Sequence, residues 1–566
     1  MPKTLANLTR AAFLAVALTA GAAPASALNL SGAYLAAMQA DFRDDYAPAA
    51  EYYERALRKD PENAGLLQNS VVMLAAMGRI GDAREQADRL SELMPENQVA
   101  ILVRLSDAIA NKDFEGALEI LNASGNTVNP LLEGLLEGWI HAGMGDFTAA
   151  QEQFDSMTAS DALEAYGQYH KALVLALAGD FNSADRIMDG DANGPLHLNR
   201  SSLLAHAQVM AQVGQTEEAI AVLDGALANG VPDAALVSLR DRLASGEEVV
   251  FTHITSAARG AAEAYLTLAE AMDGRESSRV SLIHAQLAAH IDPDLTEARM
   301  LSAELLEEQG QFELAGAALA EIPATSPWFV TSQIRRATIE NSAGNIDRGI
   351  EVLEELAATE PDRVEVHSAL GDALRSAERY EEAVTAYTDA IDLVENPVRS
   401  HWVIFYTRGI SNERADDWPA AKADFRKALE LEPNQPLVLN YLGYSMVEEG
   451  EELDEALELI EAAVAARPDD GYITDSLGWV LYRLGRIEEA VPHMLRAVEL
   501  TPDDPIINDH LGDVLWKAGR KREAEFQWRR ALSFGPAEDL DMDRVRKKIE
   551  MGLDRVIEEY GSGTDL

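Results

Sequence analysis

The chain has 566 residues, of which 47% are hydrophobic and 25% are charged, a composition that suits a folded protein with an extended core. Its 96 acidic and 47 basic side chains give a net charge of −49, a surface that repels phosphate backbones, so we expect no nucleic-acid partner. Cysteine is absent, which excludes disulfides, thiolate nucleophiles, cysteine metal sites and a lipidated amino-terminal cysteine.

The first 27 residues have the pattern of a secretory signal peptide. Lys3 and Arg10 supply a positive start, residues 11–23 are apolar, and Ala-Ser-Ala at 25–27 fits the small-x-small pattern of a cleavage site. The apolar stretch is shorter than the roughly 20 residues that span a bilayer. We expect export to the periplasm, cleavage after Ala27, no lipid anchor and no later transmembrane segment.

A period of about 34 residues runs through the chain. Small residues recur at this period, and a proline follows twelve residues after many of them. Proline ends a helix because it has no backbone N–H to donate and disfavours helix in the residue before it. Self-similarity at this period predicts a helical solenoid, in which each unit buries its apolar face against its neighbours. The recurring small residues are Ala49, Ala83, Ala117, Ala150, Ala184, Ala219, Ala315, Gly349, Ala383, Ala421, Ala456, Ala490 and Ala524.

In chain order, the first predicted pair consists of a helix over 34–40 and a partner over 48–57. They open an amino-terminal array that extends over residues 28–245. The period then lapses, and residues 246–280 are interpreted either as a degenerate repeat or as a hinge.

The carboxy-terminal array is expected over residues 281–535, and its repeats are most regular from Val364 onward. Residues 536–560 depart from the period but carry apolar residues at helical spacing, which predicts a capping helix. Residues 561–566 are expected to form a frayed tail.

The repeated pattern resembles the tetratricopeptide repeat family. Leu-Gly pairs such as Leu442-Gly443 stand in predicted first helices, alanine stands in second helices, and proline closes the unit. The resemblance covers roughly residues 31–535, with a lapse at 228–280. It implies an all-α, right-handed superhelical solenoid of helix-turn-helix repeats, with two arms joined near 228–280 as one arrangement. Members of the family usually bind other proteins or peptides.

A narrower resemblance lies in residues 439–530, most clearly in the run from Asp475 to Gly485. This segment is similar to the carboxy-terminal repeats of bacterial cell-envelope tetratricopeptide proteins. That group includes outer-membrane lipoproteins that act as adaptors for carboxyl-terminal processing proteases and deliver peptidoglycan hydrolases to them. The resemblance implies a periplasmic protease or a peptidoglycan-modifying enzyme as partner, although this chain lacks the lipobox cysteine of those members.

In the family, first helices line a concave groove, and the resemblance places ten residues of this chain at groove-facing positions. Tyrosine and tryptophan are common at binding hot spots, because they bury much area with few rotatable bonds. The alternative is that these side chains pack between adjacent helices. The ten candidates are Tyr406, Asn440, Tyr444, Tyr472, Asp475, Trp479, Tyr482, Asp509, Asp513 and Trp516.

A basic segment accompanies the last predicted repeat. Lys517, Arg520, Lys521 and Arg522 form a local positive cluster in a strongly acidic chain. We interpret it either as a dock for a carboxylate tail or an acidic partner, or as a solvated helix face.

No catalytic motif, nucleotide loop or cofactor fingerprint occurs in the sequence, and none of the eleven histidines is expected to form a metal site with acidic neighbours. The leading hypothesis is a non-catalytic periplasmic scaffold or adaptor in cell-envelope maintenance or proteolysis, without a cofactor. A self-assembling structural solenoid is the alternative, since solenoids stack end to end when a terminal cap is weak. The third hypothesis is a hydrolase with its site in residues 228–280, although about fifty residues are few for an independent catalytic core.

Overall fold

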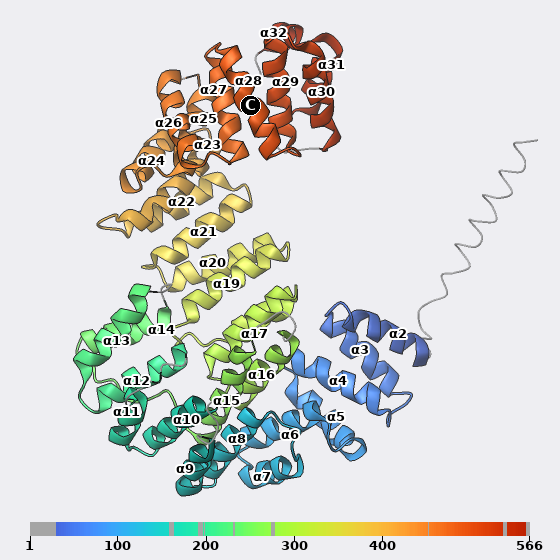
Figure 1. Ribbon diagram of the computed structural model, residues 1–566, viewed down its shortest axis with the longest axis vertical. Helices are drawn as coiled ribbons and strands as arrows, with labels where there is room; N and C mark the ends of the chain where they lie inside the picture. Colours follow the sequence, from blue (N-terminus) through green and yellow to red (C-terminus); the bar gives the residue numbers. More distant parts are fainter. Residues whose placement is uncertain are drawn as a thin grey trace, which may run out of the picture. The chain divides into compact units, whose positions relative to one another are not determined.

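The computed structural model describes residues 30–157, 163–190, 196, 199–229, 233–272, 278–450, 452–535 and 540–561. Within these residues the chain forms 31 α-helices, α2 to α32, and no strand (Figure 1). The all-helical prediction is therefore confirmed. The expected signal peptide, residues 1–27, and most of the expected tail, residues 562–566, lie outside the described residues. None of the described helices is long and apolar enough to cross a membrane.

The chain divides into two compact units, residues 1–352 (unit 1) and residues 353–566 (unit 2). The division falls inside the helix Ile346–Thr359. It does not fall near residues 228–280, where the lapse in the period suggested a join between two arms.

Unit 1 begins with six consecutive helix pairs, each made of a first and a second helix. Asparagine side chains at 63, 97 and 129 accept backbone N–H groups at the starts of three first helices, which satisfies donors that the helix leaves unpaired. The helices are α2 Leu30–Asp41, α3 Tyr46–Leu57, α4 Ala64–Ala76, α5 Ile80–Leu93, α6 Gln98–Ala110, α7 Phe114–Ala123, α8 Pro130–Gly143, α9 Phe147–Ser156, α10 Glu164–Leu177, α11 Phe181–Asp189, α12 Arg200–Gln212 and α13 Thr216–Asn229.

In six helix pairs of the described residues, a glycine on the first helix faces a bulky side chain about sixteen residues later on the second. In the α8–α9 pair, a Cβ added at Gly138 would lie 2.4 Å from the ring of Phe154. The close approach of the two helices therefore depends on the missing side chain. Unit 2 repeats this contact five times, between Gly371 and Tyr387, Gly409 and Phe425, Gly443 and Ile460, Gly478 and Met494, and Gly512 and Trp528.

The second part of unit 1 contains seven further helices. They are α14 Ala234–Ala244, α15 Ala257–Ala271, α16 Ser278–Ile291, α17 Thr296–Glu308, α18 Phe312–Ala320, α19 Phe329–Ser342 and α20 Ile346–Thr359, the last of which extends into unit 2.

Helices α15 and α16 do not simply extend the row but also pack against the first helices of the amino-terminal pairs (Figure 1). Helix α15 lies on α8, and α16 lies on α4 and α6. The hydroxyl of Tyr265 donates to the carbonyl of Leu102 over 3.5 Å, and His290 Nε2 lies 3.4 Å from Asp107 Oδ1. The first-helix face of these pairs is thus largely covered by the protein's own chain.

This packing explains why the period is lost between residues 246 and 280. Helix α15 is buried on nearly all its faces, so its apolar residues have no one-sided pattern. Its Gly260 lies against the indole of Trp139, to which an added Cβ would approach within 2.3 Å.

Unit 2 is a regular row of five helix pairs followed by two short helices. The pairs are α21 Val364–Ser376, α22 Tyr380–Asp392, α23 Trp402–Arg414, α24 Trp418–Leu431, α25 Pro436–Glu448, α26 Leu453–Ala466, α27 Gly471–Arg483, α28 Ile487–Leu500, α29 Pro505–Lys517 and α30 Lys521–Ser533, and the short helices are α31 Met542–Met551 and α32 Leu553–Tyr560.

The carboxy-terminal cap consists of two helices, not the single capping helix predicted over residues 536–560. Gly552 separates α31 from α32 with a φ of 86°, which favours glycine. The same glycine lies against Trp516, whose ring an added Cβ would approach within 2.4 Å. Residues 536–539 lie outside the described part of the chain.

The substitution Gly260→Ala tests the packing of α15 on α8. A methyl group at this position must displace the buried Trp139, so we expect a loss of about 1–3 kcal/mol in unfolding free energy, although alanine favours helix. Gly81→Ala is the matched control, because nothing lies within 4 Å of its added Cβ, and it should stabilise α5 by up to about 1 kcal/mol. Denaturant unfolding followed by circular dichroism measures both changes, and a neutral Gly260→Ala would contradict the described packing.

Candidate protein-binding surfaces

Several of the predicted groove residues join neighbouring first helices of unit 2. Asp475 on α27 lies 2.8 Å from His510 Nδ1 on α29, and the His510 ring stacks on Trp479 with centroids 4.1 Å apart. Trp479 also stacks on Tyr482 at 4.9 Å and donates its indole N–H to Glu448 on α25 over 2.7 Å. These side chains therefore pack between helices, which was the alternative to groove exposure.

The charge of His510 follows from this environment. Burial alone would lower the pKa of the imidazole, but the adjacent Asp475 and the nearby Asp509 and Asp513 outweigh burial and raise it to about 9. His510 is therefore protonated at neutral pH and donates a charge-assisted hydrogen bond to Asp475.

Asp509 and Asp513 are buried under the carboxy-terminal cap. The ammonium of Lys548 on α31 lies 2.7 Å from Asp509 Oδ2 and 2.8 Å from Asp513 Oδ2. Trp528 donates its indole N–H to the second oxygen of Asp513 over 2.9 Å. Burial disfavours the charged form of Lys548, but the two carboxylates outweigh it and raise its pKa. Neither aspartate is open to a peptide ligand.

The predicted basic dock is partly neutralised by acidic side chains of the chain itself. Lys517 and the indole N–H of Trp516 both bind Asp554 of α32, over 2.6 and 2.9 Å. Arg520 pairs with Glu523, and Lys521 lies 4.6 Å from the centre of the Trp516 ring. Arg522 is exposed.

Four predicted groove residues lie outside this network. Tyr472 is exposed, whereas Tyr406, Asn440 and Tyr444 are half-buried. Tyr406 meets Tyr441 edge-on, with ring centroids 5.9 Å apart. Asn440 has a buried Oδ1 that accepts no hydrogen bond from the described residues.

An exposed apolar row remains on unit 2, and we call it the first-helix stripe. Its members Val403, Leu437 and Tyr472 occupy the second position of α23, α25 and α27, and are 43%, 38% and 60% exposed. Ile506, at the same position of α29, is half-buried. Of these residues, only Tyr472 is among the predicted groove residues, although the spacing of 34 and 35 residues within the repeat register relates all of them.

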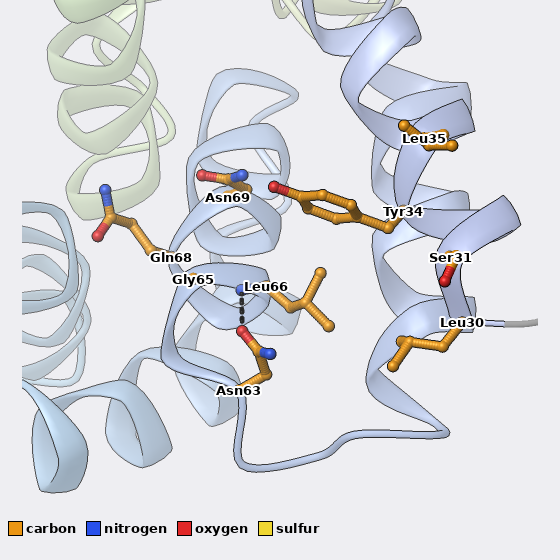
Figure 2. A pocket seen from close by; sticks show the side chains of 9 residues that line it. All are labelled: Leu30, Ser31, Tyr34, Leu35, Asn63, Gly65, Leu66, Gln68 and Asn69. Atoms are coloured by element: carbon orange, nitrogen blue, oxygen red, sulfur yellow. Dashed lines mark hydrogen bonds between the residues drawn. The ribbon is translucent and has the colours of Figure 1, made fainter.

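Unit 1 has an open pocket of about 520 Å³ between the first turns of α2 and α4 (Figure 2). Tyr34 points across the pocket toward Asn69, and Leu66 points toward α2 (Figure 2). The Asn63 side chain accepts the backbone N–H of Leu66 over 3.1 Å and so fixes the start of α4. Its lining residues, none of which is charged, are Leu30, Ser31, Tyr34, Leu35, Asn63, Gly65, Leu66, Gln68 and Asn69.

A buried cluster in unit 1 contains the residue types of a hydrolase. Ser201 Oγ lies 3.2 Å from His253 Nε2 and 2.5 Å from Glu263 Oε1, and the hydroxyl of Tyr169 donates to the same glutamate oxygen over 3.2 Å. The serine and the acid thus face the same imidazole nitrogen, whereas a proton relay needs the acid on the other nitrogen. All four side chains are buried, so the cluster has the geometry of an internal hydrogen-bond network.

Comparisons with known proteins agree with the repeat pattern. A family model described as tetratricopeptide repeat matches residues 135–184, 335–396, 406–471, 447–505 and 476–538. A TPR repeat-containing protein of Pseudomonas aeruginosa is 28% identical over 163 residues, which are 29% of this chain and 27% of that protein. Human tetratricopeptide repeat protein 13 is 27% identical over 183 residues, 31% of this chain and 21% of that protein. The chain thus aligns with only about a quarter of the length of these relatives.

Among solved structures, the Cut9–Hcn1 hetero-tetramer of the APC/C is 14% identical, with 93% of this chain and 96% of that chain covered and a TM-score of 0.37. A tetratricopeptide repeat protein from Parabacteroides merdae is 16% identical, with 45% and 97% covered and a TM-score of 0.37. Both TM-scores are low, so neither structure informs the function of this chain.

The His510–Asp475 pair predicts how the stability of unit 2 depends on pH. Because the folded pKa is raised from 6.5 to about 9, the pair's contribution is complete below pH 6.5 and is lost as the pH rises through about 9. We expect a loss of roughly 3 kcal/mol over this interval. Unfolding free energies measured at several pH values test the prediction. The variant His510→Gln should lack this dependence, and an unchanged pH profile in that variant would contradict it.

Proposed function

We propose that the chain, several parts of which match the tetratricopeptide repeat family model, is a non-catalytic scaffold that binds other proteins in the periplasm. Periplasmic location rests on the signal-peptide pattern of residues 1–27. Repeat proteins of this kind present extended surfaces built from one position per repeat.

The first-helix stripe is the observation that carries this proposal. Val403, Leu437 and Tyr472 stand at one repeat position on three successive first helices and remain exposed. Scattered exposed apolar residues are normal on a protein surface, but a row in register is typical of a binding surface. It fits an extended segment of a partner that offers apolar side chains to successive repeats.

A role as an adaptor in cell-envelope maintenance or proteolysis extends the proposal. It rests on the similarity of residues 439–530 to envelope proteins that link proteases to peptidoglycan hydrolases. Tyr472, the most exposed member of the stripe, lies within this segment. A periplasmic protease or a peptidoglycan-modifying enzyme is therefore the proposed class of partner.

The amino-terminal edge supports self-association as a second candidate function. Phe42, just after α2, is 90% exposed, whereas Ala76, the equivalent residue one repeat later, is fully buried. Leu35 and Met38 on α2 are exposed as well. Helix α4 packs on the second helix that precedes it, and α2 has no such neighbour among the described residues. An uncapped apolar edge is the feature through which solenoids stack.

The triple variant Val403→Asp, Leu437→Asp, Tyr472→Asp tests the scaffold function. Each buried apolar contact is worth about 1.5–3 kcal/mol, so three charges in the stripe should lower partner recovery more than tenfold. The measurement is crosslinking and pull-down from periplasmic extract, with mass spectrometry to place crosslinks on α23, α25 and α27. Phe526→Asp is the matched control, because Phe526 is an exposed aromatic residue on the second helix α30. Equal recovery by the triple variant and the control would count against the stripe.

Light scattering at several protein concentrations tests the second candidate. Self-association through the amino-terminal edge predicts a mass that rises with concentration, and the double variant Leu35→Lys, Phe42→Asp should abolish the rise, because it places charges on the apolar face. Phe526→Asp is again the control. A constant monomer mass for the wild type eliminates this candidate and leaves the scaffold proposal intact.

A further inference from the structure

Two helices of unit 1 bring together three side chains that commonly bind metal ions. Asp185 and Asp189 lie one turn apart on α11, and His206 faces them from α12. The His206 Nε2 atom lies 3.3 Å from Asp185 Oδ1 and 3.6 Å from Asp189 Oδ1. One donor atom from each residue lies within 4.8 Å of the other two.

Two carboxylates from α11 converge on one buried imidazole nitrogen of α12. One N–H cannot serve two carboxylate oxygens equally, so a hydrogen bond to one carboxylate does not account for the position of the other.

We propose that Asp185, Asp189 and His206 bind a divalent transition-metal ion, with Zn²⁺ as the best fit. Zinc accepts imidazole nitrogen and carboxylate oxygen at about 2.0–2.2 Å in a tetrahedron, whose ligand atoms are then about 3.3–3.6 Å apart. The separations of 3.3 and 3.6 Å from Nε2 fit two edges of such a tetrahedron. Calcium and magnesium prefer sites of six or more oxygens and should bind more weakly.

The surroundings are suited to a bound ion. Gln215 donates its side-chain N–H to Asp185 Oδ2 over 3.2 Å, and such an outer contact orients the carboxylate that would bind the metal. His206 and Asp185 are buried, whereas Asp189 is 52% exposed on its side chain. The ion can therefore enter past Asp189, and water can take the fourth position.

A bound ion would link α11, the second helix of one pair, to α12, the first helix of the next. Because the ion binds only when both helices are in place, its binding free energy would add to the stability of unit 1. This inference is independent of the proposed scaffold function, since none of its residues lies on the first-helix stripe or in the α2–α4 pocket.

Calorimetric titration of the purified, chelator-treated protein with ZnCl₂ tests the proposal. We expect one ion per chain and a higher unfolding temperature with Zn²⁺, and much weaker effects with CaCl₂ or MgCl₂. The variant Asp189→Asn changes the most exposed ligand, so it should fold, and it should weaken Zn²⁺ binding at least about tenfold. Asp241→Asn on α14 removes the same charge from an exposed position outside the site and should leave binding unchanged.

Circular dichroism confirms that both variants are folded before titration. A second variant, His206→Gln, should also lose the Zn²⁺-dependent rise in unfolding temperature. The proposal is overturned if the wild type binds no Zn²⁺, if Asp189→Asn binds it as tightly as the wild type does, or if Ca²⁺ and Mg²⁺ bind as well as Zn²⁺.

Discussion

The close contact between the two helices of a pair is the constraint on which the rest of the structure depends. In the α8–α9 pair and in the five pairs of unit 2, it requires a residue without a side chain on the first helix and a bulky residue on the second, as in Gly512 and Trp528. Since interiors are close-packed, a side chain at such a glycine would force the helices apart. Repetition of this contact in unit 2 gives its five successive pairs the same internal packing.

The face of the row that the first helices form is covered in different ways in the two units. In unit 1 it is covered by α15 and α16, which come from later in the same chain. In unit 2 it is crossed by polar and aromatic contacts between successive first helices, such as His510 with Asp475. Both arrangements bury side chains of the first helices that an open groove would expose. The surface available to partners is therefore smaller than the fold alone suggests. Among the described residues it includes the first-helix stripe and the edge near α2.

The sequence predicted the helix pairs because their signals are local. Alanine, glycine and proline at fixed offsets determine where helices meet and end, whatever lies elsewhere in the chain. Helix α15 could not be predicted in the same way, because its partner Trp139 is far away in sequence and its burial on nearly all faces removes the periodic signal. The register correctly placed Asp509 and Asp513 on a first helix, but nothing local indicated that Lys548 would cover them.

The proposed metal-binding residues could not be predicted from the sequence, because their signal is not local either. Asp185 and Asp189 have helical spacing, but so do many acidic pairs in a chain with 96 acidic residues. Only the packing of α11 on α12 distinguishes this pair, because it brings a buried imidazole to both carboxylates. In unit 2, Asp509 and Asp513 also bring two buried carboxylates close together. There the ammonium group of Lys548 supplies the positive charge that offsets them. Among the described residues, no lysine or arginine forms an ion pair with Asp185 or Asp189, and a metal ion is the simplest species that supplies the missing positive charge.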